Sequence, residues 1–255
     1  MIERDFYIRQ LEKFIDKPFV KIITGIRRSG KSTILKLFKE NLVAKGILPE
    51  QIIDINFESF IYTDLRTAEN LYNYLASRLK VSEKNYLLLD EIQEVKEWEK
   101  CVNSLLIDFD VDIYLTGSNS HLLSSELATY LAGRYIEIPI YTLSFKEYLQ
   151  FRSSFSQTKE FDKKEEFVRY LRLGGFPAIH IAEYNEESAY KIVYDIYSSI
   201  ILRDTVQRYN IREVELLERV IRYVFDNIGN TFSGKNVADY FKSQQRKIDI
   251  NTVYN

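Results

Sequence analysis

The stretch FVKIITGIRRSGKST, residues 19–33, decides the fold of this chain. Residues 19–25 form a short apolar run, rich in β-branched side chains and ending in glycine, which predicts a buried strand. Residues 32–46 then place apolar side chains at helical spacing and end in glycine, which predicts a helix. The sequence therefore predicts a strand, a glycine-containing loop and a helix in direct succession.

The loop between them matches G-x-x-x-x-G-K-[ST] at every specified position. Gly25 and Gly30 would let successive backbone N–H groups point at phosphate oxygens, assisted by the helix dipole. Lys31 would neutralise the β and γ phosphates, and the Ser32 hydroxyl would ligate Mg²⁺. A chance glycine-lysine pair at a helix start is the alternative, and the flanking strand and helix argue against it. The residues predicted to hold the nucleotide are Gly25, Ile26, Arg27, Arg28, Ser29, Gly30, Lys31, Ser32 and Thr33.

Two adjacent carboxylates end a later apolar run, YLLLDE. We expect Asp90 to hold the metal and Glu91 to act as general base on the attacking water. An acidic pair at a solvated strand end is the alternative without function. At the end of the next apolar run, Ser118 and Asn119 would lie beside these carboxylates and orient the water or touch the γ-phosphate, although Asn119 could equally cap a helix.

The remaining pattern predicts an α/β fold. Apolar strands alternate with helices through the first part of the chain, which is typical of a largely parallel sheet covered by helices on both faces. After about residue 143 the alternation stops and only helical patterns follow. The final residues, KIDINTVYN, look like a chain cut inside an element. The predicted strands are residues 19–25, 51–57, 85–90, 112–117 and 135–140.

Composition excludes several classes of protein. The 35 basic and 37 acidic residues leave a formal net charge of −2, so no global field recruits nucleic acid or an anionic membrane, and any such binding must be local. A single cysteine, Cys101, excludes an intramolecular disulfide, and two distant histidines do not suggest a metal cluster. Without a signal peptide or a long apolar run, we expect a cytoplasmic protein with no membrane span.

Together these motifs resemble the AAA+ ATPases, and within them a bacterial and archaeal group whose phosphate loop reads GIRRSGKS. Further shared stretches are LLLDEIQEVKEW, YLTGSNSHLLSSELATYLAGRYIEIPIYTLSFKEYL and YLRLGGFPA. The resemblance covers most of the chain. It implies a three-layer α/β/α P-loop NTPase core in residues 1–142, a helical lid in residues 143–212 and the start of a winged helix in residues 213–255.

The resemblance also implies roles for single residues. Asn56 matches a polar position that can hold the catalytic glutamate inactive, which predicts an Asn56–Glu91 contact. Ser118 and Asn119 match the polar sensor after the fourth strand. Arg134 lies where related subunits present an arginine finger to a neighbour, which would require a homo-oligomer, whereas a helix-terminal arginine is the alternative. A lid sensor could be any of several arginines, among them Arg203.

Outside the phosphate site, several alternatives stay open. Arg4 and Tyr7 either border the adenine or belong to an amphipathic helix packed on the core. From Thr231 onward the chain carries a slight basic excess, which fits DNA contact and protein docking equally. The sequence therefore predicts an ATPase that uses ATP and Mg²⁺ and couples nucleotide state to DNA or a partner protein. The alternative is an interaction scaffold that binds nucleotide with little turnover, and a kinase is a poorer third choice.

Overall fold

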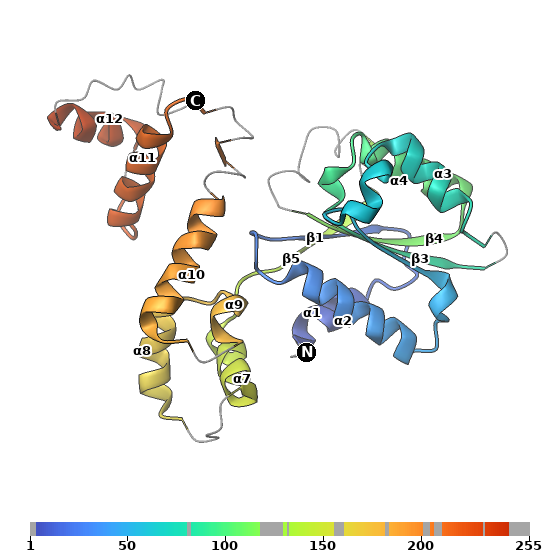
Figure 1. Cartoon of the computed structure of the whole chain (residues 1–255), viewed down its shortest axis with the longest axis horizontal. Coiled ribbons are helices and arrows are strands. Elements are labelled where there is room, and N and C mark those ends of the chain that lie inside the picture. The colour runs from blue at the N-terminus through green and yellow to red at the C-terminus, as the bar shows by residue number, and fades with distance from the viewer. Residues whose placement is uncertain are drawn as a thin grey trace. The chain divides into compact units, whose positions relative to one another are not determined.

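The computed structural model describes residues 4–80, 83–117, 130–131, 133–155, 161–181, 184–200, 205–206, 211–231 and 233–244. The chain divides into two compact units, Met1–Ile200 and Ile201–Asn255. The first contains the sheet, its covering helices and a group of further helices, and the described residues of the second include two α-helices (Figure 1).

The sheet has five strands in the order β2-β3-β4-β1-β5, and every neighbouring pair is parallel. The expected strands are all present, and the predicted parallel α/β fold is confirmed. Because parallel strands point the same way, all five carboxyl ends lie along one edge of the sheet, where such folds bind ligands. The strands are β1 (Val20–Thr24), β2 (Ile52–Asn56), β3 (Asn85–Asp90), β4 (Val111–Thr116) and β5 (Tyr135–Pro139).

Helices cover both faces of this sheet (Figure 1). Helices α1 (Asp5–Glu12) and α2 (Lys31–Ala44) pack on one face, and α3 (Ala68–Ala76) and α4 (Trp98–Asp108) pack on the other. Alternate residues of β3 point into the two apolar cores, since Leu88 joins the α1–α2 side while its neighbours join the α3–α4 side. The three layers follow from strands that are apolar on both faces. Three short 3₁₀ helices lie in the connections, at Pro49–Gln51, Phe60–Leu65 and Ile92–Glu94.

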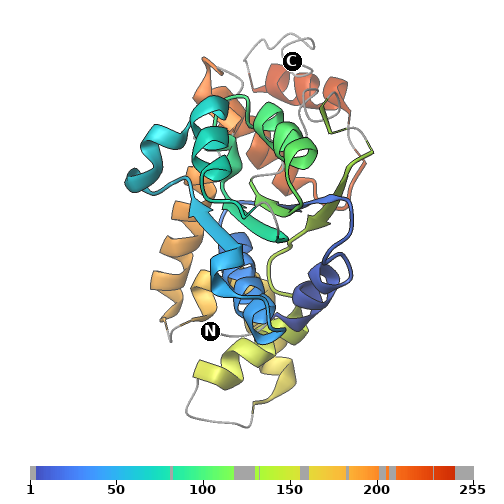
Figure 2. The same ribbon diagram turned by 90° about the vertical axis from the view of Figure 1, so that its right-hand side faces the viewer.

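A helical group follows the sheet in the first unit. Helices α7, α8 and α9 pack together, and α10 packs on α8 and α9 (Figure 1 and Figure 2). The stretch GGFP, residues 174–177, leads from the end of α8 into the first residue of α9. At Gly175 a Cβ atom would lie 2.4 Å from the Leu143 carbonyl oxygen, so the turn can approach the connection after β5 only because it has no side chain there. The helices are α7 (Phe145–Phe155), α8 (Lys163–Leu173), α9 (Pro177–His180) and α10 (Glu186–Ser199).

The second unit begins with the amphipathic helix α11 (Val214–Asp226) and continues, after a turn at Gly229, into α12 (Gly234–Ser243). The Ser233 hydroxyl accepts a hydrogen bond from the Asn236 backbone N–H and so caps α12. The element expected in the final residues, KIDINTVYN, lies outside the described residues. Among the helices that the structure describes, none combines the length and hydropathy needed to cross a bilayer.

A buried charged pair lies toward the amino ends of the strands, opposite the ligand-binding edge. Lys21 of β1 donates to the Asp112 carboxylate of β4, and both side chains are almost completely excluded from solvent. Asp112 also accepts from the Asp16 backbone N–H at 2.8 Å and from the Tyr114 hydroxyl at 2.9 Å. Burial lowers the pKa of Lys21, and the negative charge of Asp112 opposes that shift. The pair therefore depends on both partners being present.

Removal of one partner should be costly. We expect Lys21→Met to lower the free energy of unfolding by about 3–5 kcal/mol, because Asp112 is left buried and uncompensated. The double variant Lys21→Met/Asp112→Asn should recover part of the loss, because it also removes the orphaned charge. Urea denaturation measures both. Lys39→Met is the matched control, since the Lys39–Asp54 pair is partly exposed and should contribute less than about 1 kcal/mol; an equal loss in Lys21→Met and the control would contradict the prediction.

Candidate functional site

The phosphate loop joins β1 to α2 at the carboxyl edge of the sheet. Its backbone requires glycine at two positions. At Gly25, where φ is 150°, a Cβ atom would lie 2.3 Å from the Ile140 carbonyl oxygen. Gly30, with φ of 103°, is the N-cap of α2. The loop therefore turns directly onto the N-terminus of α2, the arrangement that an anion-binding loop requires.

The side chains that begin α2 face the end of β3. Lys31 is buried, and its Nζ donates to the carbonyl oxygens of Gly25 at 3.1 Å and Ile26 at 3.4 Å. The Ser32 hydroxyl donates to Asp90 Oδ1 at 3.1 Å. The structure therefore brings together the loop and the first of the two predicted carboxylates.

Asp90 is the centre of a hydrogen-bond network. Thr116, the last residue of β4, donates its hydroxyl hydrogen to Asp90 Oδ1, and Asn56 Nδ2 donates to Asp90 Oδ2 at 2.8 Å. The Asn56–Glu91 contact that the sequence predicted is not the one formed here. Asn56 and Asp90 are register partners in the parallel ladder of β2 and β3, so their side chains leave the same face of the sheet. Asn56 is therefore hydrogen-bonded to Asp90 and not to Glu91.

Glu91 follows directly but leaves the strand in the left-handed conformation, with φ of 56° and ψ of 50°. Its backbone N–H donates to the Thr116 hydroxyl at 2.9 Å. Its carboxylate accepts from the Gln93 side chain and lies 3.9 Å from Lys31 Nζ. The turn thus separates the two neighbouring carboxyl groups, so that Asp90 is buried while Glu91 projects toward the phosphate loop.

Burial raises the pKa of Asp90 above its usual range, and the negative charge of Glu91 adds to the rise. Hydrogen bonds from Thr116 and Ser32 and the charge of Lys31 act in the opposite direction. The site therefore holds a carboxylate whose negative charge is poorly solvated. A bound cation would relieve that cost.

The residues present fit a nucleotide with a divalent cation. Among the described residues, the buried Ser29 hydroxyl has no hydrogen-bond partner, which leaves a polar group of the loop available to a ligand. The Ser32 hydroxyl and the Asp90 carboxylate supply adjacent oxygen atoms, the type of ligand that Mg²⁺ prefers. The arrangement can therefore hold anionic phosphate on the loop and a hard cation beside it.

The other predicted nucleotide contacts differ in exposure. Arg27 pairs with Glu58 at 2.9 Å, on the chain segment after β2. Arg28 has a left-handed backbone, with φ of 62°, and is exposed, as is the Thr33 side chain. Ile26 is about half exposed. These side chains are not gathered around Asp90, so the loop would act mainly through its backbone.

The remaining predicted site residues do not lie beside Asp90 in the part of the chain that the structure describes. Ser118 and Asn119 lie outside the described residues. Arg134 is exposed just before β5, and its Nη1 donates to Asn103 at 3.3 Å. Its carbonyl accepts from the Val20 backbone N–H, which places it at the amino ends of β1 and β5, away from its own phosphate loop. Arg134 could therefore act only on the nucleotide of a second copy.

Two contacts of this region were not predicted from the sequence. Thr116 joins Asp90 to the turn at Glu91, but in the sequence it is only the β-branched residue at the end of a predicted strand. Arg4 donates to the Ser29 carbonyl oxygen at 3.0 Å, inside the phosphate loop, although it precedes that loop by many residues. In the sequence, only the charge of Arg4, just before an amphipathic helix, pointed to such a contact. Tyr7 is buried in the α1–α2 core, as the packing alternative predicts.

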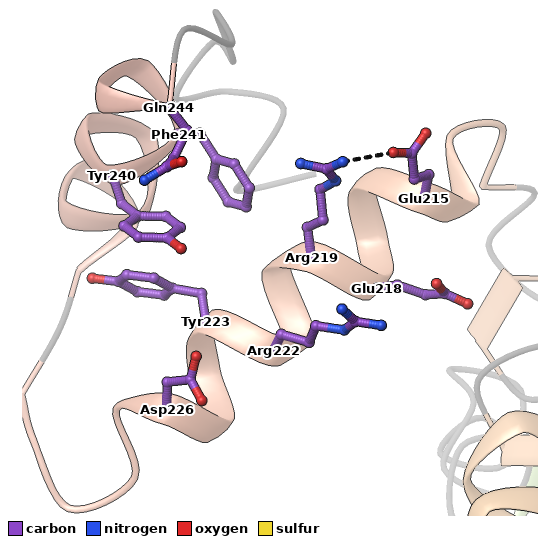
Figure 3. A pocket seen from close by; sticks show the side chains of 9 residues that line it. All are labelled: Glu215, Glu218, Arg219, Arg222, Tyr223, Asp226, Tyr240, Phe241 and Gln244. Atoms are coloured by element: carbon purple, nitrogen blue, oxygen red, sulfur yellow. Dashed lines mark hydrogen bonds and ion pairs between the residues drawn. The ribbon is translucent and has the colours of Figure 1, made fainter.

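The second unit has a hollow of about 450 Å³ between α11 and α12 (Figure 3). Tyr223 and Tyr240 lie in its lining with their rings in contact, the centroids 4.7 Å apart. Two arginines in the lining are offset by acidic side chains, and Arg219 pairs with Glu215 at 2.8 Å. This mixed lining does not form a basic surface for nucleic acid. The lining residues are Glu215, Glu218, Arg219, Arg222, Tyr223, Asp226, Tyr240, Phe241 and Gln244.

Comparison with known proteins identifies the family. The model of a family described as an AAA domain matches residues 17–149, slightly more than half of the chain. The chain therefore belongs to the AAA domain family. A second model, described as a domain of unknown function, matches residues 164–253. The family and the phosphate loop together support nucleotide binding at the site described above.

Two curated relatives match nearly the whole chain. An uncharacterized protein of Haemophilus influenzae is 39% identical over 254 residues, which cover 99% of this chain and 62% of the relative. An uncharacterized protein of Methanocaldococcus jannaschii is 32% identical over 267 residues, which cover 100% of this chain and 56% of the relative. The chain therefore spans less than two thirds of the length of both.

A solved structure supports the fold. The Walker-type ATPase of Pyrococcus abyssi is similar with a TM-score of 0.64 at 18% sequence identity, over 100% of this chain and 87% of that chain. At this identity the likeness shows the P-loop NTPase-type architecture alone.

Thr116 gives the site a specific test. We expect Thr116→Val to weaken nucleotide binding in the presence of Mg²⁺ by about 10- to 100-fold, because Asp90 loses a donor and the Glu91 N–H loses its acceptor. Thr116→Ser keeps the hydroxyl and should stay close to the wild type. Titration with a fluorescent nucleotide, with Mg²⁺ and with EDTA, measures the effect. Equal affinities of the valine and serine variants would show that the hydroxyl does not support the site.

Proposed function

We propose that this chain is an AAA+ ATPase module that binds ATP with Mg²⁺ and hydrolyses it to ADP and phosphate. The observation that carries the proposal is that four side chains lie together at one edge of the sheet. The Ser32 hydroxyl is 3.1 Å from Asp90 Oδ1, and Lys31 Nζ is 3.9 Å from the Glu91 carboxylate. A phosphate loop alone would support binding. The second carboxylate, held apart from the first, is what favours hydrolysis.

Each group has a separate task in this proposal. Ser32 and Asp90 would hold Mg²⁺, which supplies positive charge to the oxygens of the β and γ phosphates. Lys31 would bind the same phosphate oxygens, and the loop N–H groups would orient them. Glu91 would orient a water molecule and accept its proton as the water attacks the γ-phosphorus. Thr116 would keep Asp90 and Glu91 in this arrangement, since its hydroxyl contacts both residues.

A second copy of the chain could complete the site. Arg134 lies at the opposite edge of the sheet from its own phosphate loop, so we propose that it contacts the γ-phosphate of a neighbouring copy in a homo-oligomer. Ser118 and Asn119, which directly follow β4 and Gly117, would act as polar sensors of the γ-phosphate in the same copy.

We further propose that residues 143–212 act as the lid and residues 213–255 as a partial winged helix that couples nucleotide state to DNA or a partner protein. The capped helix α12 and the amphipathic helix α11 support a small helical module there. The mixed charge of the hollow between them favours a protein partner over nucleic acid at that surface. A nucleotide-bound scaffold with little turnover is the second candidate, and the relatives' additional length would then carry the output.

Two substitutions separate binding from hydrolysis. We expect Glu91→Gln to bind ATP within about threefold of the wild type and to lose at least about 100-fold in single-turnover hydrolysis, because a general base contributes 10²- to 10⁴-fold. Lys31→Ala should lose ATP binding. Glu50→Gln, an exposed glutamate in the short helix before β2, is the control and should match the wild type. If the wild type binds ATP but hydrolyses it no faster than Glu91→Gln, the scaffold is correct.

Whether the partner is DNA or a protein can be tested with the wild-type protein. Duplex DNA that stimulates hydrolysis, with an affinity that falls steeply as salt rises, would support coupling to DNA, because phosphate contacts release counterions. Partner retention that salt does not affect would support a protein partner.

A further inference from the structure

Arg4 is a buried arginine that the proposed chemistry does not use. Only 4% of it is exposed, and burial of a guanidinium is costly unless hydrogen bonds satisfy it. It lies just before α1, and its donors reach three separate segments. Nη1 donates to Ser29 O at 3.0 Å, Nη2 to Tyr141 O at 3.0 Å and Thr142 O at 3.4 Å, and Nε to Glu147 Oε1 at 2.7 Å. Arg4 therefore connects the phosphate loop, the segment after β5 and the first turn of α7.

The contact in the phosphate loop acts on a particular peptide. The Ser29 carbonyl and the Gly30 N–H belong to one planar peptide unit, so holding the oxygen also fixes the direction of the hydrogen. A guanidinium at the oxygen polarises the unit and strengthens the N–H as a donor. Gly30 is the N-cap of α2, where a loop of this kind offers its N–H groups to phosphate. Arg4 thus acts on the loop from the side opposite the phosphate.

The other contacts hold the start of the helical group. Glu147 also accepts from the backbone N–H and the hydroxyl of Ser144, each at 2.9 Å, so the same carboxylate joins Arg4 to the N-terminus of α7. The charge of Arg4 contributes to the lowered pKa of Glu147, against the effect of burial. At neutral pH the Arg4–Glu147 contact is therefore an ion pair.

The connection between β5 and α7 is also hydrogen-bonded to α8 and to the turn before α9. Leu143 N donates to Gly175 O at 2.7 Å, and the Tyr170 hydroxyl of α8 donates to Leu143 O at 2.8 Å. On the other side, Tyr141 N donates to the Tyr7 hydroxyl at 3.2 Å. The segment that carries the Arg4 contacts is thus hydrogen-bonded to α1 before it and to the α8–α9 turn after it.

We propose that Arg4 is a positioning residue that couples phosphate binding at the loop to the placement of α7, α8 and α9. Phosphate that binds the Gly30 N–H shifts the Ser29–Gly30 peptide, and Arg4 transmits that shift to Tyr141, Thr142 and Glu147. The same coupling makes the placement of these helices a determinant of nucleotide affinity, since linkage is reciprocal. The inference rests on nucleotide binding by the loop, as proposed above.

The test compares Arg4→Gln, Arg4→Lys and Glu147→Gln with Arg9→Gln, a control on the exposed side of α1. Hydrogen exchange of α7, α8 and α9 is measured with and without saturating ATP and Mg²⁺, and nucleotide affinity by titration. We expect ATP to protect these helices in the wild type and in Arg9→Gln. In Arg4→Gln the protection should vanish and affinity should fall on the order of tenfold. Arg4→Lys, which keeps a charge but not the planar fork, should be intermediate.

Glu147→Gln keeps the experiment decisive if Arg4→Gln does not fold. It weakens the contact on the α7 side and leaves the Ser29 contact in place, so protection should fall, and affinity should fall by less than in Arg4→Gln. The Arg4→Gln/Glu147→Gln double variant should be no worse than Arg4→Gln alone, because both substitutions interrupt one connection. If Arg4→Gln folds and shows the normal ATP-induced protection, the coupling inference is wrong, but the proposed function is not affected. If Arg4→Gln does not fold, the same result in Glu147→Gln overturns the inference. A wild-type protein that does not bind ATP overturns the proposed function and this inference with it.

Discussion

The position of β4 between β1 and β3 is the constraint on which the site depends. The phosphate loop follows β1, and the two carboxylates lie at the end of β3, yet these strands are not neighbours. The groups can meet only across the end of β4, so the residue there must be small and polar. Thr116 meets both requirements with one hydroxyl, which donates to Asp90 and accepts from the Glu91 backbone. The order of the strands thus explains why β4 ends in a threonine.

The fold and most of the phosphate site could be predicted, because their signals are local. A run of apolar residues followed by GIRRSGKS identifies β1, the loop and α2 within a few residues, and YLLLDE identifies the end of β3 in the same way. The partner of Asn56 could not be predicted, since it depends on the register of β2 against β3, and a slip of one residue would turn its side chain to the other face. The contacts of Arg4 depend on segments more than 100 residues apart and carry no local pattern.

The two ends of the sheet use buried charge differently. At the amino ends, Lys21 and Asp112 form an ion pair, and Asp112 also accepts hydrogen bonds from nearby donors. At the carboxyl ends, the Asp90 carboxylate accepts from the neutral donors Asn56, Ser32 and Thr116, and its pKa is raised by burial. The first arrangement pairs opposite charges within the chain, whereas the second leaves a poorly solvated carboxylate whose cost a bound cation would relieve. The difference separates a structural cluster from a binding site without reference to any motif.

The left-handed backbone at Glu91 has a consequence for the evolution and engineering of this chain. A residue with a side chain pays on the order of 1 kcal/mol to adopt that conformation, while glycine adopts it freely. Replacement by glycine would relieve the strain and delete the carboxylate in one step. Selection for heat resistance alone would therefore favour variants at position 91 that are more stable but lack this carboxylate, so a screen for stabilised forms of this protein must also measure the proposed ATP hydrolysis beside the melting temperature.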